Sequence, residues 1–264
     1  MKLTHIDLFS GIGGFALAAQ WVGFETIVFC ENDEYCQKVI KKHWPAVPII
    51  QDIRDFDGTK WQGAALLTGG FPCQDLSKAG KQAGIYGERS GLWGELFRIM
   101  CEVRPRFTLI ENVVSLVTGD GGLWFQRLLS DLAEGGFHVE WECIPASSIG
   151  APHHRDRVFI VAYPNENGWM RIFSKANFKG RRNMGNNIRT DWFGCGENTW
   201  SGWETETRKE IFSQPVIARI NDGVSSWVDR NSALGNAIVP QVAYEIIKGI
   251  AEIEKSSKRG GDLE

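Results

Sequence analysis

The chain has 264 residues, of which 43% are hydrophobic and 11% aromatic, and a formal net charge of −3. A chain of this length and composition can bury a large core, which excludes a disordered or fibrous protein. The negative charge argues against a uniformly basic nucleic-acid-binding protein, although a total can conceal a local basic patch. No apolar run is long enough for a membrane span or a secretory signal, so we expect an intracellular, cytoplasmic protein.

The six cysteines occupy positions 30, 36, 73, 101, 143 and 195. They form no Cys-x-x-Cys pair, and no histidine stands at the spacing of a zinc ligand. The adjacent pair His153 and His154 lacks a third ligand at a matching spacing. The sequence therefore predicts reduced thiols, with neither a disulfide framework nor a bound metal.

Up to residue 163, short apolar runs alternate with amphipathic stretches. Strand-like runs occupy residues 4–9, 25–30, 47–50, 64–69, 106–113, 137–144 and 156–163. Helix-like stretches occupy residues 14–23, 33–44, 91–103 and 124–135. This alternation predicts an α/β protein in which helices cover both faces of a mostly parallel sheet.

The composition changes after Pro164. The segment 164–216 is rich in Asn, Gly, Trp and Arg and shows no sustained helical or strand-like periodicity. It indicates a small irregular lobe that follows a domain at 1–163, and residues 217–264 then return to that domain. Within it, residues 165–190 carry the basic residues Arg171, Lys175, Lys179, Arg181, Arg182 and Arg189, interleaved with Trp169, Phe173 and Phe178. Composition leaves open whether this is a solvated loop or a surface facing nucleic acid. Periodicity returns at 239–255 and predicts a helix, beginning near Pro240, that packs on the first domain.

Residues that follow the expected strands lie at one edge of the sheet, where open α/β folds bind ligands. The first strand leads into the glycine-rich stretch DLFSGIGG, and the second ends at Glu31, about 20 residues later, where a carboxylate can accept both ribose hydroxyls. Together they favour a nucleoside-bearing cofactor. Asp52 follows the third strand and could accept from an adenine amino group, but taken alone it is better interpreted as a cap.

Cys73 follows the fourth strand, and Glu111, in LIENV, follows the fifth. A thiol beside a carboxyl suits attack on a ring that is protonated elsewhere as it is attacked. The alternatives are a packed thiol and an ordinary surface carboxylate. The amides of Gln74 and Asn112, each one residue further on, favour the functional interpretation.

Two arginines precede the apolar run VFIVA. Arg155 and Arg157 are two residues apart and would point to the same side of a strand, where they could hold a carbonyl oxygen or a phosphate. The alternative is an exposed ion-pair cluster with Asp156.

Five segments occur in a fixed order: DLFSGIGG, GGFPCQDLS, ENV, HRDRVF and LGNAIVPQ. In this order they resemble the successive motifs of the DNA cytosine-C5 methyltransferases, over about residues 1–163 and 217–255. The resemblance implies a Rossmann-like, S-adenosylmethionine-dependent enzyme that flips a cytosine out of duplex DNA.

The resemblance also implies roles for individual residues. Cys73 would add to C6 of the cytosine, and Glu111 would hydrogen-bond to N3 or donate a proton to it. Arg157 would contact O2 and hold Glu111 in position. Gln74, Asn112 and Arg155 complete the implied catalytic set. The implied cofactor-binding positions are Phe9, Gly11, Gly13, Glu31, Asn32, Asp52, Ile53, Pro72, Leu92, Asn236 and Ala237. Two positions depart from the family: Asn32 stands where a bulky residue often stacks on adenine, and His153 where a glutamine often begins the arginine motif.

Residues 77–91 match the loop that closes over DNA in this family. The expected nucleic-acid contacts are Ser77, Lys81, Gln82, Arg89, Arg181 and Arg182. The short segment 164–216 matches the target-recognition region and predicts a short recognition sequence. We expect a monomer that acts on double-stranded DNA, with a possible cognate restriction enzyme. The alternatives are a tRNA cytosine-C5 methyltransferase and a catalytically silent nucleic-acid-binding module.

Overall fold

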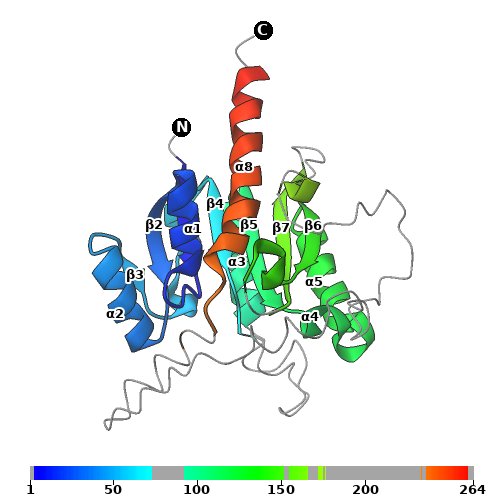
Figure 1. Ribbon diagram of the computed structural model, residues 1–264, viewed down its shortest axis with the longest axis horizontal. Coiled ribbons are helices and arrows are strands. Elements are labelled where there is room, and N and C mark those ends of the chain that lie inside the picture. Colours follow the sequence, from blue (N-terminus) through cyan, green and yellow to red (C-terminus); the bar gives the residue numbers. More distant parts are fainter. Residues whose placement is uncertain are drawn as a thin grey trace.

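The computed structural model describes residues 3–72, 92–151, 155–165, 172–174, 176, 233 and 236–260. Within these residues one sheet of seven strands has the order β3-β2-β1-β4-β5-β7-β6 (Figure 1). The strands are β1 (Thr4–Leu8), β2 (Glu25–Cys30), β3 (Ile49–Ile50), β4 (Leu66–Gly69), β5 (Phe107–Val113), β6 (Phe137–Ile144) and β7 (Arg157–Pro164). All seven lie where the sequence predicts them.

The sheet is parallel from β3 to β5, and β7 runs antiparallel to both of its neighbours. The mostly parallel sheet was predicted; the direction of β7 was not. Because β7 is reversed, its first residue, Arg157, pairs with Val113 at the end of β5. The start of β7 therefore lies at the edge where the parallel strands end.

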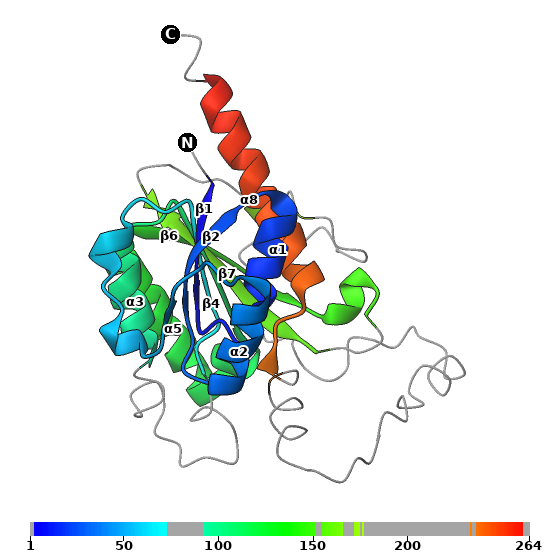
Figure 2. The same cartoon turned by 90° about the vertical axis from the view of Figure 1, so that its left-hand side faces the viewer.

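Helices cover both faces of the sheet. They are α1 (Gly14–Val22), α2 (Glu34–His43), α3 (Leu92–Val103), α4 (Ser115–Thr118), α5 (Leu123–Glu134) and α8 (Pro240–Gly260), with short 3-10 turns η1 (Ile53–Asp55), η2 (Gly58–Trp61), η5 (Gly119–Gly122), η6 (Ala146–Ile149) and η8 (Ile172–Ser174). Figure 2 shows α3 and α5 on one side of the sheet and α1, α2 and α8 on the other. In the described residues no helix is long and apolar enough to cross a membrane.

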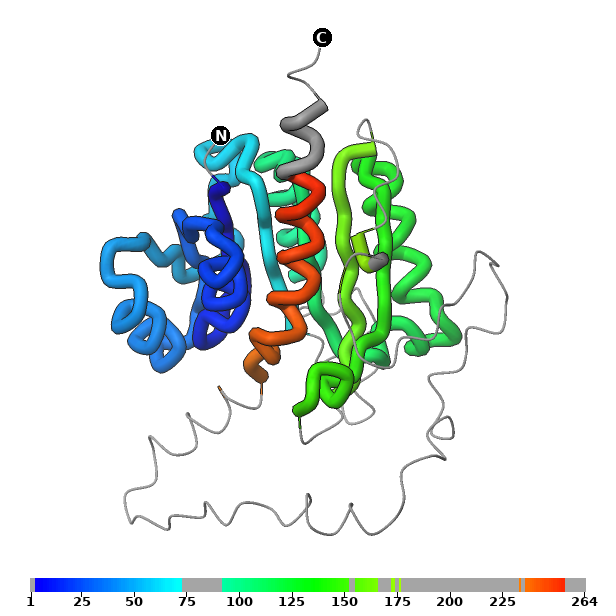
Figure 3. The backbone as a smooth tube through the Cα atoms, turned by 45° about the horizontal axis from the view of Figure 1, so that its top comes forward, coloured from blue at the N-terminus to red at the C-terminus, as the bar shows by residue number. Residues whose placement is uncertain are grey.

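The two faces carry separate cores. On one face, residues of α3 and α5 such as Leu96 and Leu128 pack with Leu67 and Ile110 of the sheet. On the other face α8 lies beside α1 (Figure 3), and its fully buried Ile246 and Ile250 share a core with Phe15 and Ala19 of α1. The prediction that the C-terminal helix packs on the first domain is therefore confirmed.

Phe173 differs from the expectation for the basic segment. Its side chain is 4% exposed and belongs, with the neighbouring Ile172, to the core that contains α8. The amide of Ile172 donates to Oε1 of Glu140 at 3.1 Å, which attaches η8 to β6. Placing Phe173 on an exposed basic and aromatic surface was wrong, because apolar burial outweighs the polar composition around it. Trp169 and Phe178 lie outside the described residues.

A chain of buried polar side chains crosses the three adjacent strands β2, β1 and β4. The ring nitrogens of His5 lie 2.9 Å from Oγ1 of Thr26 and 2.8 Å from Oγ1 of Thr68, and the Thr68 hydroxyl donates to Oδ1 of Asp7 at 2.7 Å. Burial lowers the pKa of His5 to about 3. Burial also raises the pKa of Asp7 to about 8, although hydrogen bonds from Thr68 and the Ala16 amide oppose this shift. His5 is therefore neutral at pH 7, whereas the carboxyl group of Asp7 changes its protonation state about one pH unit above this value.

The stability of the protein should depend on pH through Asp7. Its pKa is raised above the ordinary 3.8, so its contribution to stability is full below pH 3.8 and is lost as the pH rises through about 8. His5 is neutral in both the folded and the unfolded state over most of the range from pH 7 to 9, so it adds little to this pH dependence. Between about pH 7 and 9 we expect the wild-type protein to lose about 1–2 kcal/mol of unfolding free energy relative to Asp7→Asn. Urea unfolding of both proteins across this range measures the difference; parallel pH profiles would contradict it.

Candidate active site

The glycine-rich turn after β1 is tied to the end of β2 by Glu31. Oε2 of Glu31 accepts from the amide of Gly11 at 2.6 Å, and Oε1 accepts from the amide of Asp33 at 2.8 Å. Burial raises the pKa of Glu31, and these amide hydrogen bonds oppose the shift. A carboxylate has about four lone-pair positions, so about two remain for ligand hydroxyl groups. The predicted ribose-binding residue is thus held in place at the expected edge.

The backbone of this turn is left-handed at Phe9 (φ 51°), Gly11 (φ 54°) and Gly13 (φ 85°). Phe9 is not a glycine, and such a conformation is rare outside functional sites and tight turns. A Cβ on Gly13 would lie 2.6 Å from the Trp44 ring. The glycine at position 13 therefore permits both the turn and a close packing contact.

The C-terminal segment reaches the same edge. A Cβ on Gly14 would collide with Cγ2 of Ile238, so the backbone of α1 contacts the residues that precede α8. Nη2 of Arg155 donates to the carbonyl of Ala237 at 2.8 Å. The predicted positions Asn236 and Ala237 are thereby brought beside the glycine-rich turn, more than 200 residues away in the chain.

Asp52 caps the turn η1. Its Oδ1 accepts from the amide and Nε of Arg54, at 2.9 and 3.0 Å, and its Oδ2 accepts from Nη2 at 2.8 Å. These hydrogen bonds hold the pKa of Asp52 below its ordinary value. The interpretation as a cap is confirmed, and a contact with adenine stays a prediction. The neighbouring Ile53 is 5% exposed and packs in the core, while Asn32 is exposed and Leu92 partly buried.

Glu111 pairs with Arg157 across β5 and β7. Nε of Arg157 lies 2.9 Å from Oε1 of Glu111, whose side chain is 13% exposed. Burial raises the pKa of Glu111, and the charges of Arg157 and Arg155 oppose that rise. A carboxyl group with a raised pKa can donate a proton near neutral pH. The predicted proximity of Glu111 and Arg157 is present in the structure.

The segment that leads to Cys73 passes directly against this ion pair. A Cβ on Gly70 would lie 3.2 Å from Oε2 of Glu111. Asn112 is buried; its Nδ2 donates to the carbonyl of Phe71 at 3.1 Å, and its Oδ1 accepts from the amide of Val113 at 2.8 Å. Asn112 therefore anchors the backbone two residues before Cys73, next to Pro72, which is exposed.

Arg155 has a different place from Arg157. It precedes β7 with a left-handed backbone (φ 36°), and burial lowers its pKa. Its hydrogen bond to Ala237 joins the start of β7 to the C-terminal segment. The structure therefore gives Arg155 a role in holding this segment, in addition to the positive charge that it places near Glu111.

Several predicted residues lie outside the described part of the chain: Cys73, Gln74, Ser77, Lys81, Gln82, Arg89, His153, Arg181 and Arg182. In the described part, no group of three or more His, Cys, Asp or Glu side chains could hold a metal ion. Sequence reasoning missed Gly70, whose signal was the glycine pair before Phe71.

This sheet, with its glycine-rich turn and acidic strand ends, defines a Rossmann-like methyltransferase fold. The chain belongs to the C-5 cytosine-specific DNA methylase family, whose sequence profile matches residues 3–214.

Individual relatives agree with this assignment. The chain is 37% identical over 174 residues to the Type II methyltransferase M2.BsuMI of Bacillus subtilis (strain 168), covering 64% of this chain and 44% of the relative. It is 33% identical over 172 residues to the Type II methyltransferase M.DsaV of Dactylococcopsis salina, covering 65% of this chain and 49% of that relative. The Dnmt2 methyltransferase of S. pombe has the same fold, with a TM-score of 0.53 and 18% identity over 69% of this chain and 57% of that one. The matches span less than half of the two Type II enzymes.

Proposed function

We propose that this protein is a DNA (cytosine-5-)-methyltransferase that transfers a methyl group from S-adenosylmethionine to C5 of a cytosine flipped out of double-stranded DNA. The observation that carries the proposal is the partly buried Glu111–Arg157 pair, which lies against the backbone leading to Cys73. Membership of the C-5 cytosine-specific DNA methylase family supports the same reaction.

The residues at the glycine-rich turn fit S-adenosylmethionine. The Glu31 carboxylate has lone pairs free for the ribose hydroxyls, and open space surrounds Gly11, where a Cβ would meet no atom within 4 Å. Asp52 and Ile53 would border the adenine. Leu92 would make a further contact with the cofactor, and Asn236 with Ala237 would close the site from the C-terminal segment. When bound, the cofactor supplies an electrophilic methyl group.

The side chains of the protein must make C5 of cytosine reactive. We infer that the Cys73 thiolate adds to C6, which moves electron density to C5 and N3. Glu111 donates a proton to N3 as this charge develops, while Arg157 holds the Glu111 carboxyl and contacts O2. After C5 has gained the methyl group it loses its proton to a base, and the C6–S bond breaks to return the thiolate. N3 then gives its proton back to the Glu111 carboxylate, which restores both the neutral base and the acid.

We assign DNA contacts to Ser77, Lys81, Gln82, Arg89, Arg181 and Arg182. The basic side chains among them, Lys81, Arg89, Arg181 and Arg182, would neutralise phosphates and position the duplex. The short segment 164–216 supports a short recognition sequence. Action as a monomer and a partner restriction endonuclease complete the proposal.

Incubation with tritiated S-adenosylmethionine tests the reaction. We expect label in unmethylated genomic DNA and not in bulk tRNA, and bisulfite sequencing should place it at one short cytosine context. Label in tRNA alone would replace the proposal with an RNA-modifying activity. A long or bipartite context would contradict the short recognition sequence, and no label in either substrate would indicate a silent binding module.

A further inference from the structure

One arginine of α3 holds the turn that follows β3. Nη2 of Arg98 donates to the carbonyl of Ile53 at 3.2 Å, and Nη1 donates to the carbonyl of Phe56 at 3.0 Å. On its own helix Arg98 contacts Oε2 of Glu95 through Nε at 2.9 Å and Oε1 of Glu102 through Nη1 at 2.8 Å. The carboxylates on both sides keep the guanidinium aimed at the two carbonyl oxygens.

Glu102 makes a second connection to the same loop. Its Oε2 accepts from the amide of Gly58 at 2.9 Å, and a Cβ on Gly58 would lie 2.8 Å from Cβ of Glu102. The loop backbone therefore lies directly against α3, and a glycine is needed for this approach. We call these contacts, between Arg98, Glu95 and Glu102 of α3 and the backbone of Ile53, Phe56 and Gly58, the Arg98 clamp.

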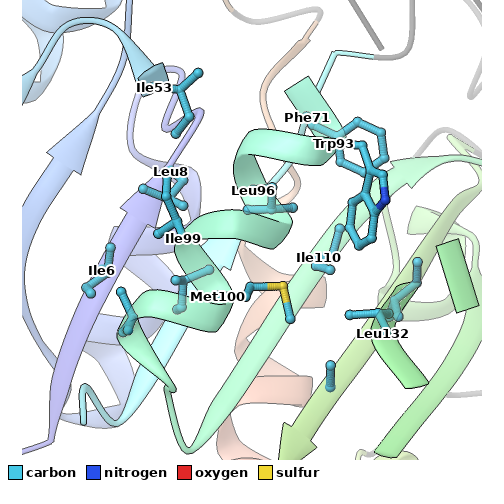
Figure 4. Packing of buried hydrophobic residues seen from close by; sticks show 14 of the residues in the cluster. Ile6, Leu8, Ile53, Phe71, Trp93, Leu96, Ile99, Met100, Ile110 and Leu132 are labelled. Carbon is cyan, nitrogen blue, oxygen red and sulfur yellow. The ribbon is translucent and has the colours of Figure 1, made fainter. Parts of the chain in front are cut away.

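The clamp joins two parts of the proposed cofactor site. Ile53 opens η1, and Leu92 is the first residue of α3; both match cofactor-bordering positions. Figure 4 shows Ile53 over Leu8, and these two side chains share one core with Leu96 of α3. Apolar contacts alone allow this turn to slide along the helix, whereas hydrogen bonds from a planar guanidinium fix its position and orientation.

We propose that Arg98 is a positioning residue that fixes the adenine side of the cofactor site by holding the η1 turn against α3. The inference rests on the proposed function, because the adenine is assigned through it. Arginine is required because its five N–H donors serve two carboxylates and two carbonyl groups at once. A lysine ammonium offers three donors from a single atom and reaches fewer of these partners.

Cofactor affinity, measured separately from turnover, tests the clamp. Calorimetric titration of the full chain with S-adenosylhomocysteine should show a Kd for Arg98→Met about tenfold above that of the wild type, with Arg98→Lys between them. With DNA, the KM for S-adenosylmethionine should rise by a similar factor while kcat at saturating cofactor stays within about twofold. Gly58→Ala disturbs the same clamp from the loop side and should also raise the Kd.

Arg106→Met is the matched control. Arg106 pairs with Glu254 at 2.8 Å just before β5, at the edge of the sheet opposite the proposed site. This variant should lower the thermal midpoint and leave the Kd unchanged. Equal Kd values for Arg98→Met and wild type, or an equal rise for Arg106→Met, would overturn the inference and leave the proposed function intact. No binding by the wild-type protein would overturn the proposed cofactor, and the clamp's role with it.

Discussion

Replacing Cys73 with alanine should abolish methyl transfer to DNA. Without a thiolate to add at C6, C5 of cytosine stays too poor a nucleophile to attack a methyl group, and no other residue of the proposed mechanism supplies that addition. The cofactor site is built from other residues, so the Kd for S-adenosylhomocysteine should stay within about twofold of wild type. Tritium transfer to duplex DNA and calorimetry of the same preparation measure the two quantities.

The control for this substitution is Cys101→Ala. Cys101 is an exposed residue of α3, and partial desolvation of its thiol is the main cause that raises its pKa. A thiol with a raised pKa is a weak nucleophile near neutral pH, so this variant should keep wild-type turnover. Normal methylation by Cys73→Ala would remove the nucleophile assignment. Loss of both transfer and cofactor binding would instead show that Cys73 is a structural residue.

Most of the fold could be predicted because each element has a local signal. The strands are apolar runs that end at polar or glycine residues, and α3 and α5 show a clear helical period. The direction of β7 could not be predicted. A strand such as RVFIVAYP, buried along most of its length, has the same sequence pattern whether it runs parallel or antiparallel.

The site was predictable in part for the same reason. Glu31 directly follows β2 and Glu111 lies two residues before the end of β5, so their presence at the same edge of the parallel sheet follows from topology. The contact between Glu111 and Arg157 needs the reversed β7 and its register, which the sequence does not contain. Arg98 was missed because its spacing to Glu95 and Glu102 resembles an ordinary helical ion pair, while its carbonyl partners lie 42 and 45 residues away.

Replacing Glu111 with glutamine should lower kcat by about 10²- to 10⁴-fold, the usual contribution of a general acid or base. The amide keeps the size of the side chain and an oxygen that can accept from Arg157, but it has no acidic proton to give to N3. Burial raises the pKa of Glu111, so the protonated, active form of the wild type should be lost as the pH rises through that pKa. The residual activity of Glu111→Gln should lack this alkaline decline.

Single-turnover rates across the pH range, with saturating cofactor, separate proton donation from binding. Glu140→Gln is the matched control, since it makes the same chemical change in a carboxylate that accepts from the Tyr163 hydroxyl at 3.0 Å and the Ile172 amide. It should keep the wild-type rate and its pH profile. If Glu111→Gln kept the wild-type rate, or if its residual activity retained the alkaline decline, another group would be donating the proton. The Glu111–Arg157 pair would then serve only to orient the flipped cytosine.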